Sequence, residues 1–223
     1  MKTNPVPFLH CLAIGALLAT AAPPAHAQGI LYNNFGPGDT YMLSGSWALS
    51  ATTPVAANPF TATGNTLQFD SVTLALAAIP GRPNQIDVWL MSDAGGLPDA
   101  IIEAFHFTNA MPPADYQFHS PLVASSIFHP LLEEGTRYWV AASVADYVTT
   151  PGIYAQWNMN PTGDTGPFAF REAGIDHWFV NPGGNERGAY RVKAVPEPNS
   201  SAVLLAGLVG LALNRWQVAR GKA

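Results

Sequence analysis

The sequence predicts an all-β fold, a jelly-roll-like antiparallel β-sandwich, and three observations support this fold class. Short apolar stretches recur at intervals of about ten residues, as in sandwiches that are built from many short strands. Twenty glycines and twenty prolines supply the turns between them. Charged residues make up only 11% of the chain, and its middle part carries no sustained 3.6-residue apolar pattern of an amphipathic helix.

The alternation of side chains predicts the individual strands. Residues 85–91 show it most clearly, because Ile86, Val88 and Leu90 alternate with a second set that contains Trp89. Residues 100–108 read as another strand, with a turn or two of helix as the alternative. Further strands are expected at residues 30–35, 47–50, 59–63, 126–132, 137–144, 153–158, 167–172, 177–180 and 189–194.

Residues 66–77 predict a strand with one irregularity. Leu67 and Phe69 fall on one side, but Val72 and Leu74 continue the apolar set with the opposite parity. A change of parity within a strand is what one inserted residue produces. The sequence therefore predicts a β-bulge around Asp70 and Ser71.

The middle of the chain is acidic and lacks cysteine. Residues 28–195 contain six Lys and Arg against fourteen Asp and Glu, a net charge of −8. This charge repels phosphate backbones and anionic lipids, so we expect no binding to nucleic acid. The single cysteine, Cys11, precedes this part of the chain. The middle therefore has no disulfide, thiolate metal site or thiol nucleophile.

The N-terminal residues have the three parts of a secretory signal peptide. Lys2 supplies the positive charge, residues 8–22 are mostly apolar, and Ala25 and Ala27 form a small-x-small cleavage site before Gln28. We expect export by the Sec machinery and cleavage between Ala27 and Gln28. An uncleaved anchor is the alternative, which the short apolar stretch disfavours because a membrane span needs about 20 residues.

The C-terminal residues form a second addressing segment. A short stretch of small and apolar residues, 200–213, is followed by three basic residues, which favours a short transmembrane helix with a cytoplasmic basic end. The tetrapeptide that precedes it consists of Val195, Pro196, Glu197 and Pro198.

This order of motif, apolar stretch and basic cluster in residues 195–223 resembles the PEP-CTERM sorting signal. The resemblance implies that an exosortase, a membrane enzyme of bacteria that make exopolysaccharide, recognises the tetrapeptide. It also implies transient anchoring in the inner membrane, followed by transfer to the cell surface or release outside the cell. An ordinary C-terminal tail anchor is the alternative. The chain then has three parts: a signal peptide (residues 1–27), an extracellular β-domain (residues 28–194) and the sorting segment (residues 195–223).

The β-domain itself resembles the choice-of-anchor R family of bacterial extracellular domains. Three stretches carry this resemblance: residues 63–76, 86–105 and 133–143. They consist of packing and turn residues, so the family implies a location at the cell surface and contributes no catalytic residues.

A loop with two carboxylates is the candidate metal site. Asp93 and Asp99 flank a Gly-Gly-Leu-Pro turn, and residues 160–164 are similar in composition. Loop carboxylates and carbonyls are ligands of calcium, but the same residue types form ordinary tight turns. Calcium is thus a weak candidate cofactor at Asp93 and Asp99, and we expect no other cofactor.

Catalytic motifs are missing from the sequence. The chain contains no Gly-x-Ser-x-Gly nucleophile elbow, and the adjacent Glu133 and Glu134 precede Gly135 as in a solvated turn. The four histidines of the β-domain have no zinc-site spacing. We therefore expect no enzymatic activity.

Tryptophans give the only indication of a ligand. Trp89 and Trp139 alternate with aliphatic residues, so they face outward if the aliphatic residues fill the core. Exposed indoles stack on sugar rings; the alternative is that both are core residues. The sequence thus favours a matrix or adhesion module that associates with exopolysaccharide or a biofilm. The alternatives are a structural surface protein that contacts other proteins and, as the weakest, an enzyme that acts on polysaccharide.

Overall fold

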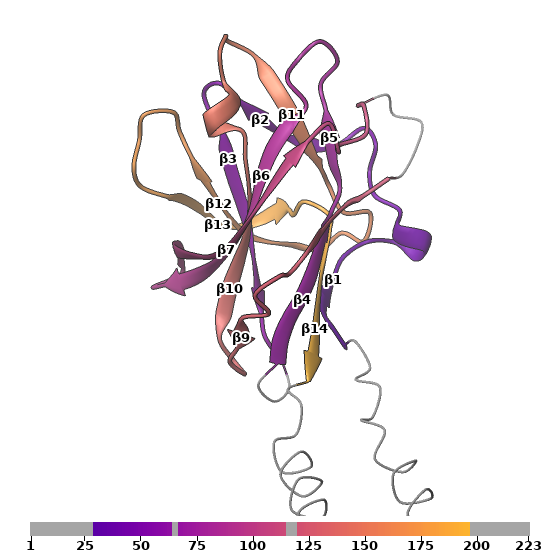
Figure 1. The fold of residues 1–223 in the computed structure, drawn as a ribbon, viewed down its shortest axis with the longest axis vertical. Helices are drawn as coiled ribbons and strands as arrows, with labels where there is room; N and C mark the ends of the chain where they lie inside the picture. Colours follow the sequence, from indigo (N-terminus) through magenta and orange to yellow (C-terminus); the bar gives the residue numbers. More distant parts are fainter. Residues whose placement is uncertain (1–28, 64–66, 115–119, 197–223) are drawn as a thin grey trace, which may run out of the picture. The chain divides into compact units, whose positions relative to one another are not determined.

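The computed structural model describes residues 29–63, 67–114 and 120–196 of the chain. These residues form antiparallel β-sheets joined by turns and two short 3-10 helices, without any α-helix (Figure 1). The predicted all-β class is confirmed, and the arrangement is consistent with a β-sandwich. The described part contains no helix that is long and apolar enough to cross a membrane. The predicted signal peptide, the Ala27–Gln28 junction and residues 197–223 lie outside the described residues.

Three antiparallel sheets make up the fold. The five-stranded sheet contains β1 (Gly29–Asn33), β14 (Tyr190–Pro196), β4 (Leu67–Leu74) and β8 (Leu122–Ser125) in this order, and β9 (Leu131–Leu132) also pairs with β4. The six-stranded sheet has the order β13 (Phe179–Glu186), β12 (Thr165–Arg171), β3 (Val55–Thr61), β10 (Arg137–Ser143), β6 (Gln85–Ala94) and β7 (Leu97–Thr108). The three-stranded sheet consists of β2 (Ser46–Ser50), β11 (Ile153–Asn158) and β5 (Leu76–Ala78).

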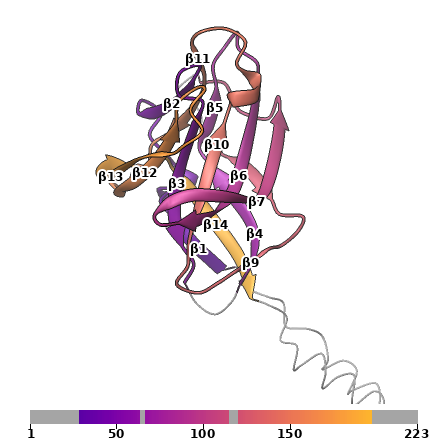
Figure 2. The same ribbon diagram turned by 90° about the vertical axis from the view of Figure 1, so that its left-hand side faces the viewer.

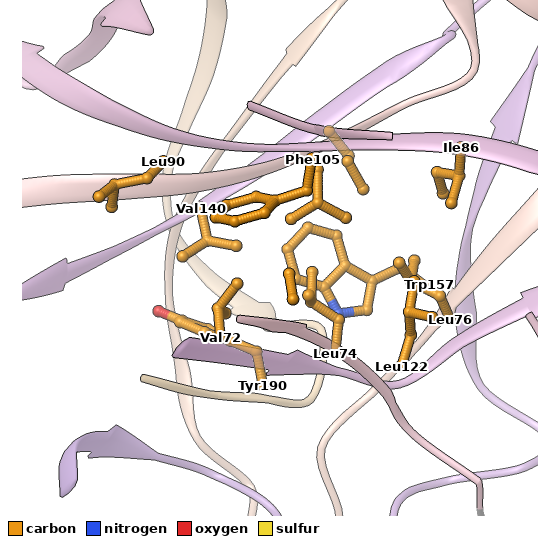
Figure 3. Close-up of a cluster of buried hydrophobic side chains, with 14 of the residues drawn as sticks. Val72, Leu74, Leu76, Ile86, Leu90, Phe105, Leu122, Val140, Trp157 and Tyr190 are labelled. Atoms are coloured by element: carbon orange, nitrogen blue, oxygen red, sulfur yellow. The ribbon is translucent and has the colours of Figure 1, made fainter. Parts of the chain in front are cut away.

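The main hydrophobic core draws residues from all three sheets. Figure 3 shows aliphatic side chains of β4 and β6 around Trp157 of β11 and Tyr190 of β14. Both aromatic residues are fully buried, and each gives its polar atom a backbone partner: Trp157 Nε1 donates to Ala189 O at 3.0 Å and Tyr190 Oη to Pro59 O at 2.6 Å. A buried indole or phenol costs free energy unless it is paired in this way.

A second hydrophobic cluster covers the opposite face of the six-stranded sheet. Its buried members are Val55, Ala57, Trp89, Met91, Trp139, Ala141 and Ala169. On β6, Ile86, Val88 and Leu90 enter the main core, while Trp89 and Met91 enter the second cluster. The predicted alternation of β6 is therefore confirmed. The central strands of this sheet are buried on both faces.

The predicted bulge of β4 is also confirmed. In the pairing of β14 with β4, Lys193 lies opposite Ser71 and Ala194 opposite Phe69, so Asp70 is the inserted residue. The insertion lets both Phe69 and Val72 reach the main core despite their opposite parity.

Other strand predictions need correction. Residues 126–132 do not form one strand: β8 ends at Ser125, β9 begins at Leu131, and a loop lies between them. β3 begins at Val55, four residues before the predicted start, because its alanines carry no visible alternation. Residues 100–108 are a strand, as predicted, and not the alternative helix.

The two described ends of the chain belong to neighbouring strands. Gly29 of β1 pairs with Ala194 of β14, and the last residue of β14, Pro196, pairs with Leu67 of β4. The β14 end and β9 lie at the same end of the domain in both views (Figures 1 and 2). Chain segments that precede and follow the domain therefore attach close to one another.

Candidate functional site on the outer face of the six-stranded sheet

The face of the six-stranded sheet that points away from the main core brings together Trp89 and Trp139, the two predicted sugar-stacking residues. We call it the outer face. β6 contributes Trp89 and Met91, β10 contributes Trp139, and β12 contributes Arg171; Trp178 lies just before β13. The register explains this gathering, because Met91 pairs with Trp139 across β6 and β10. Residues that pair across strands point to the same side of a sheet.

A row of alanines forms the floor of the outer face. Trp89 pairs with Ala141, Ala141 with Ala57, and Ala57 with Ala169, across four neighbouring strands. All three alanines are completely buried. Their small side chains leave room above the sheet, and the large indoles from neighbouring positions fill it.

The predicted exposure of Trp89 and Trp139 is wrong. Trp139 has 0% of its surface exposed and Trp89 only 9%. The prediction assumed that one face of the sheet contacts the core and the other contacts solvent, but the second cluster covers both indoles. Trp139 also donates its Nε1 hydrogen to Asp93 Oδ1 at 2.7 Å. Neither ring has a free face on which a sugar could stack. Both tryptophans are core residues, which is the alternative that the sequence left open.

Arg171 and Trp178 are the partly exposed members of this arrangement. The Arg171 guanidinium carbon lies 4.8 Å from the ring centre of Trp178 and 5.7 Å from that of Trp89. Such cation–π contacts hold a guanidinium flat against an indole. Arg171 Nη1 also lies 3.7 Å from Asp176 Oδ1, a long ion pair with a fully exposed carboxylate. The result is a surface pair of an indole and an arginine, supported from below by Trp89.

Sequence reasoning did not identify this pair. Trp178 is one of the five tryptophans between residues 28 and 194 and has no distinguishing pattern, and the sequence predicts no role for Arg171. The sequence does contain one indication of the position of Arg171, the alternation of side chains along β12. Arg171 lies two positions after Ala169 and therefore on the same face.

Asp93 and Asp99 lie in the β6–β7 hairpin at one edge of the outer face. Asp93 Oδ2 accepts a hydrogen bond from Gly96 N at 3.0 Å, and Gly95 and Gly96 both have positive φ, 65° and 88°. Asp99 Oδ2 accepts from Ser92 Oγ at 3.4 Å. These contacts match the alternative in which the residues form an ordinary tight turn, because both oxygens of Asp93 already bind protein donors. Within the described residues, no group of three or more His, Cys, Asp or Glu side chains is placed to hold a metal ion.

The second candidate loop, residues 160–164, is held by its own side chains. Asn160 Oδ1 accepts from Thr162 N at 3.1 Å, Thr162 Oγ1 at 2.9 Å and Asp164 N at 2.9 Å. The Asp164 carboxylate accepts hydrogen bonds from Tyr32 and Asn34. These groups stabilise the turn and join it to the start of the domain.

A polar cluster at the opposite end of the paired strands β6 and β7 contains Asp87, His106 and Tyr147. Asp87 is buried, and its Oδ1 lies 2.7 Å from His106 Nδ1 and accepts from Tyr147 Oη at 2.6 Å. The His106 side chain is 74% exposed. Burial, and next the hydrogen bond to Asp87, raise the pKa of Tyr147 from 10.0 to about 12. The cluster satisfies a buried carboxylate and holds an imidazole at the surface.

Comparisons with known proteins add no identification. No protein-family model matches the chain, and no curated protein is similar to it. The resemblances to the PEP-CTERM signal and to the choice-of-anchor R family therefore stay predictions.

Replacing Asp93 with alanine should destabilise the domain by about 1–3 kcal/mol, because the buried indole nitrogen of Trp139 loses its acceptor. Asp99→Ala is the matched control and should change the free energy of unfolding by less than about 0.5 kcal/mol. Urea denaturation of both variants measures the difference. Equal stability of the two variants would show that the Asp93 contact is dispensable.

Tyr147→Phe should lower the Tm at pH 9, where the wild-type phenol is neutral and donates to Asp87. The raised pKa means that this stabilisation is complete below about pH 10 and is lost as the pH rises to about 12. The Tm difference between wild type and variant should therefore narrow between pH 10 and pH 12. Circular dichroism melting curves at each pH test this, and a constant difference would contradict the role of Tyr147.

Proposed function

We propose that the chain is an exported cell-surface or extracellular-matrix protein that an exosortase sorts and that associates with exopolysaccharide or a biofilm. In this proposal the Sec machinery exports it, residues 200–213 hold it in the inner membrane as a short helix, and processing near the tetrapeptide transfers it to the surface. The proposal includes the jelly-roll-like description of the sandwich and assigns no catalytic activity. In the same proposal, the protein binds no nucleic acid.

One observation carries the exopolysaccharide part: the pair of Arg171 and Trp178 on the outer face. An indole edge beside a guanidinium offers an apolar surface for a sugar ring and donors for its hydroxyl or carboxylate oxygens. Trp89 supports the guanidinium from below, so the pair is held in place before a ligand binds. Such preorganisation lowers the entropy cost of binding.

The position of the chain ends supports the sorting part. The folded strands end at Pro196, within the tetrapeptide that the proposed exosortase would recognise. Glu197 and Pro198 follow directly. Val195 and Pro196 pair with Gln68 and Leu67 of β4, so recognition of the whole tetrapeptide requires only the last pairs of β14 to open.

A second candidate function is a structural surface protein that contacts other proteins and binds no defined ligand. The burial of Trp89 and Trp139 favours it, because the two indoles that were expected to stack on sugars serve the fold. The two candidate functions differ in whether Trp178 contacts a saccharide ligand, and a binding experiment separates them.

Trp178→Ala should weaken binding to exopolysaccharide. In native affinity gels cast with exopolysaccharide from the bacterium that encodes the chain, wild-type residues 28–196 should be retarded, and the variant should lose most of the retardation. Stacking of one indole on a ligand ring contributes about 0.5–1.5 kcal/mol, or roughly a threefold to tenfold change in affinity. Phe128→Ser, an exposed aromatic residue outside the outer face, is the matched control and should keep full retardation.

Three outcomes of this gel are informative. Free migration of the wild type would favour the structural candidate. Retardation that Trp178→Ala leaves unchanged would exclude the outer-face pair as the binding site. Retardation that EDTA abolishes would return Asp93 and Asp99 to consideration as a calcium site.

Replacement of Pro196, Glu197 and Pro198 by alanine should leave export intact and block maturation. Full-length protein should then accumulate in the inner membrane, because the exosortase no longer recognises the tetrapeptide. Cell fractionation and immunoblotting measure this accumulation. Normal surface release of the triple variant would overturn the sorting proposal, whereas loss of export would identify a defect in secretion.

A further inference from the structure

The loop between β8 and β9 exposes two large apolar side chains in succession. Ile127 is 80% exposed and Phe128 79%, the largest values among the exposed apolar residues of the described part. Leu131, at the start of β9, is also exposed. We call residues 126–130 the apolar loop. Single exposed apolar residues are common on protein surfaces, but two adjacent ones on one loop expose surface that an interaction partner would cover.

A buried carboxylate holds the apolar loop in this conformation. Glu103 of β7 is buried, and its Oε2 accepts from Ser126 Oγ at 2.7 Å. Its Oε1 accepts from the backbone nitrogens of Ile127 at 2.8 Å and Phe128 at 3.3 Å. Burying a carboxylate costs free energy unless several donors bind it. The fold therefore uses a buried charge to order a loop whose two largest side chains contribute nothing to the core.

Three further contacts attach the loop to β4. Ser126 N donates to Asp70 O at 2.7 Å, and Phe69 N donates to Pro130 O at 2.9 Å. His129 has a left-handed backbone conformation, with φ of 46°, and its Nδ1 lies 3.1 Å from Phe69 O. A loop that is ordered in advance loses little entropy when a partner binds it.

The position of the loop identifies the partner. Leu132 of β9 pairs with Leu67 of β4. Pro196, the last residue of β14, pairs with the same Leu67. Figures 1 and 2 show β9 and the end of β14 at one end of the domain. The chain continues from there to the apolar stretch at residues 200–213, which begins four residues after Pro196, at most about 14 Å away.

With residues 200–213 in the bilayer, as the proposed function requires, their short length keeps the preceding residues at the lipid interface. A helix of its fourteen residues is about 21 Å long, whereas the hydrocarbon core of a bilayer is about 30 Å thick. A span that is too short draws its flanking residues toward the interface. The acidic charge of the domain, a net −8 for residues 28–195, opposes anionic lipids. The acidic charge does not oppose an apolar contact with zwitterionic lipid.

We infer that the apolar loop is a lipid-contact site: Ile127 and Phe128 enter the interfacial region of the bilayer that the C-terminal segment spans. The inference rests on the proposed function, because it requires residues 200–213 to lie in the membrane. The contact orients the domain on the membrane surface before the chain is processed.

Site-specific fluorescence tests the contact. The chain after Ala27 has no cysteine, so one introduced cysteine can be labelled selectively with an environment-sensitive fluorophore. Residues 28–223 carrying Phe128→Cys are reconstituted in phosphatidylcholine vesicles that contain brominated lipid. The label should be quenched at least twofold relative to vesicles without bromine, and 0.5 M NaCl should not change this because the contact is apolar.

Two control positions make the result decisive. Ile175→Cys, an exposed apolar position in the β12–β13 connection, should show no quenching. Leu208→Cys, in the apolar stretch, reports whether the C-terminal segment enters the bilayer. Quenching at positions 128 and 208 but not at 175 supports the inference.

Failure of the lipid contact and failure of the proposed membrane segment give different quenching patterns. Quenching at 208 without quenching at 128 overturns the lipid contact and leaves the membrane segment of the proposed function intact. Absence of quenching at 208 overturns both. Equal quenching at 128 and 175 also overturns the inference, because the domain then contacts lipid without a defined orientation.

Discussion

The burial of the central strands of the six-stranded sheet on both faces is the constraint on which the rest of the structure depends. β6 and β10 supply apolar side chains at every position of their central parts, one set for the main core and one set for the second cluster. A strand that is buried on both faces has no solvent-exposed row of side chains. Ligand contacts must therefore come from its edges, its hairpins and the loops around it.

The exposed features of the domain follow from this constraint. Trp178 and Arg171 lie at the edge of the sheet, where β12 and β13 leave an indole and a guanidinium partly exposed above the second cluster. The apolar loop lies at the edge of the five-stranded sheet, between β8 and β9. Both features are attached to buried residues, to Trp89 in one case and to Glu103 in the other, so both have a defined geometry.

Three carboxylates, two of them buried and one half-buried, organise the parts of the domain that strand pairing leaves free. Glu103 binds three donors of the apolar loop. Asp93 binds the indole of Trp139 and the turn of the β6–β7 hairpin. Asp87 binds Tyr147 and His106. In a chain without disulfides after Ala27, such contacts add specific geometry to a core that apolar burial alone would hold together loosely.

The sequence by itself determined the all-β class, the alternation of β6 and the bulge at Asp70, because side-chain parity is a local property of an extended chain. It did not reveal that Trp89 and Trp139 are buried or that residues 126–130 leave the strand. Only the tertiary structure decided these points. The burial of an indole depends on what covers the sheet, here Arg171, Trp178 and Val180 from parts of the chain distant in sequence. The apolar loop depends on Glu103, which precedes it by 23 residues and has no sequence pattern that links the two.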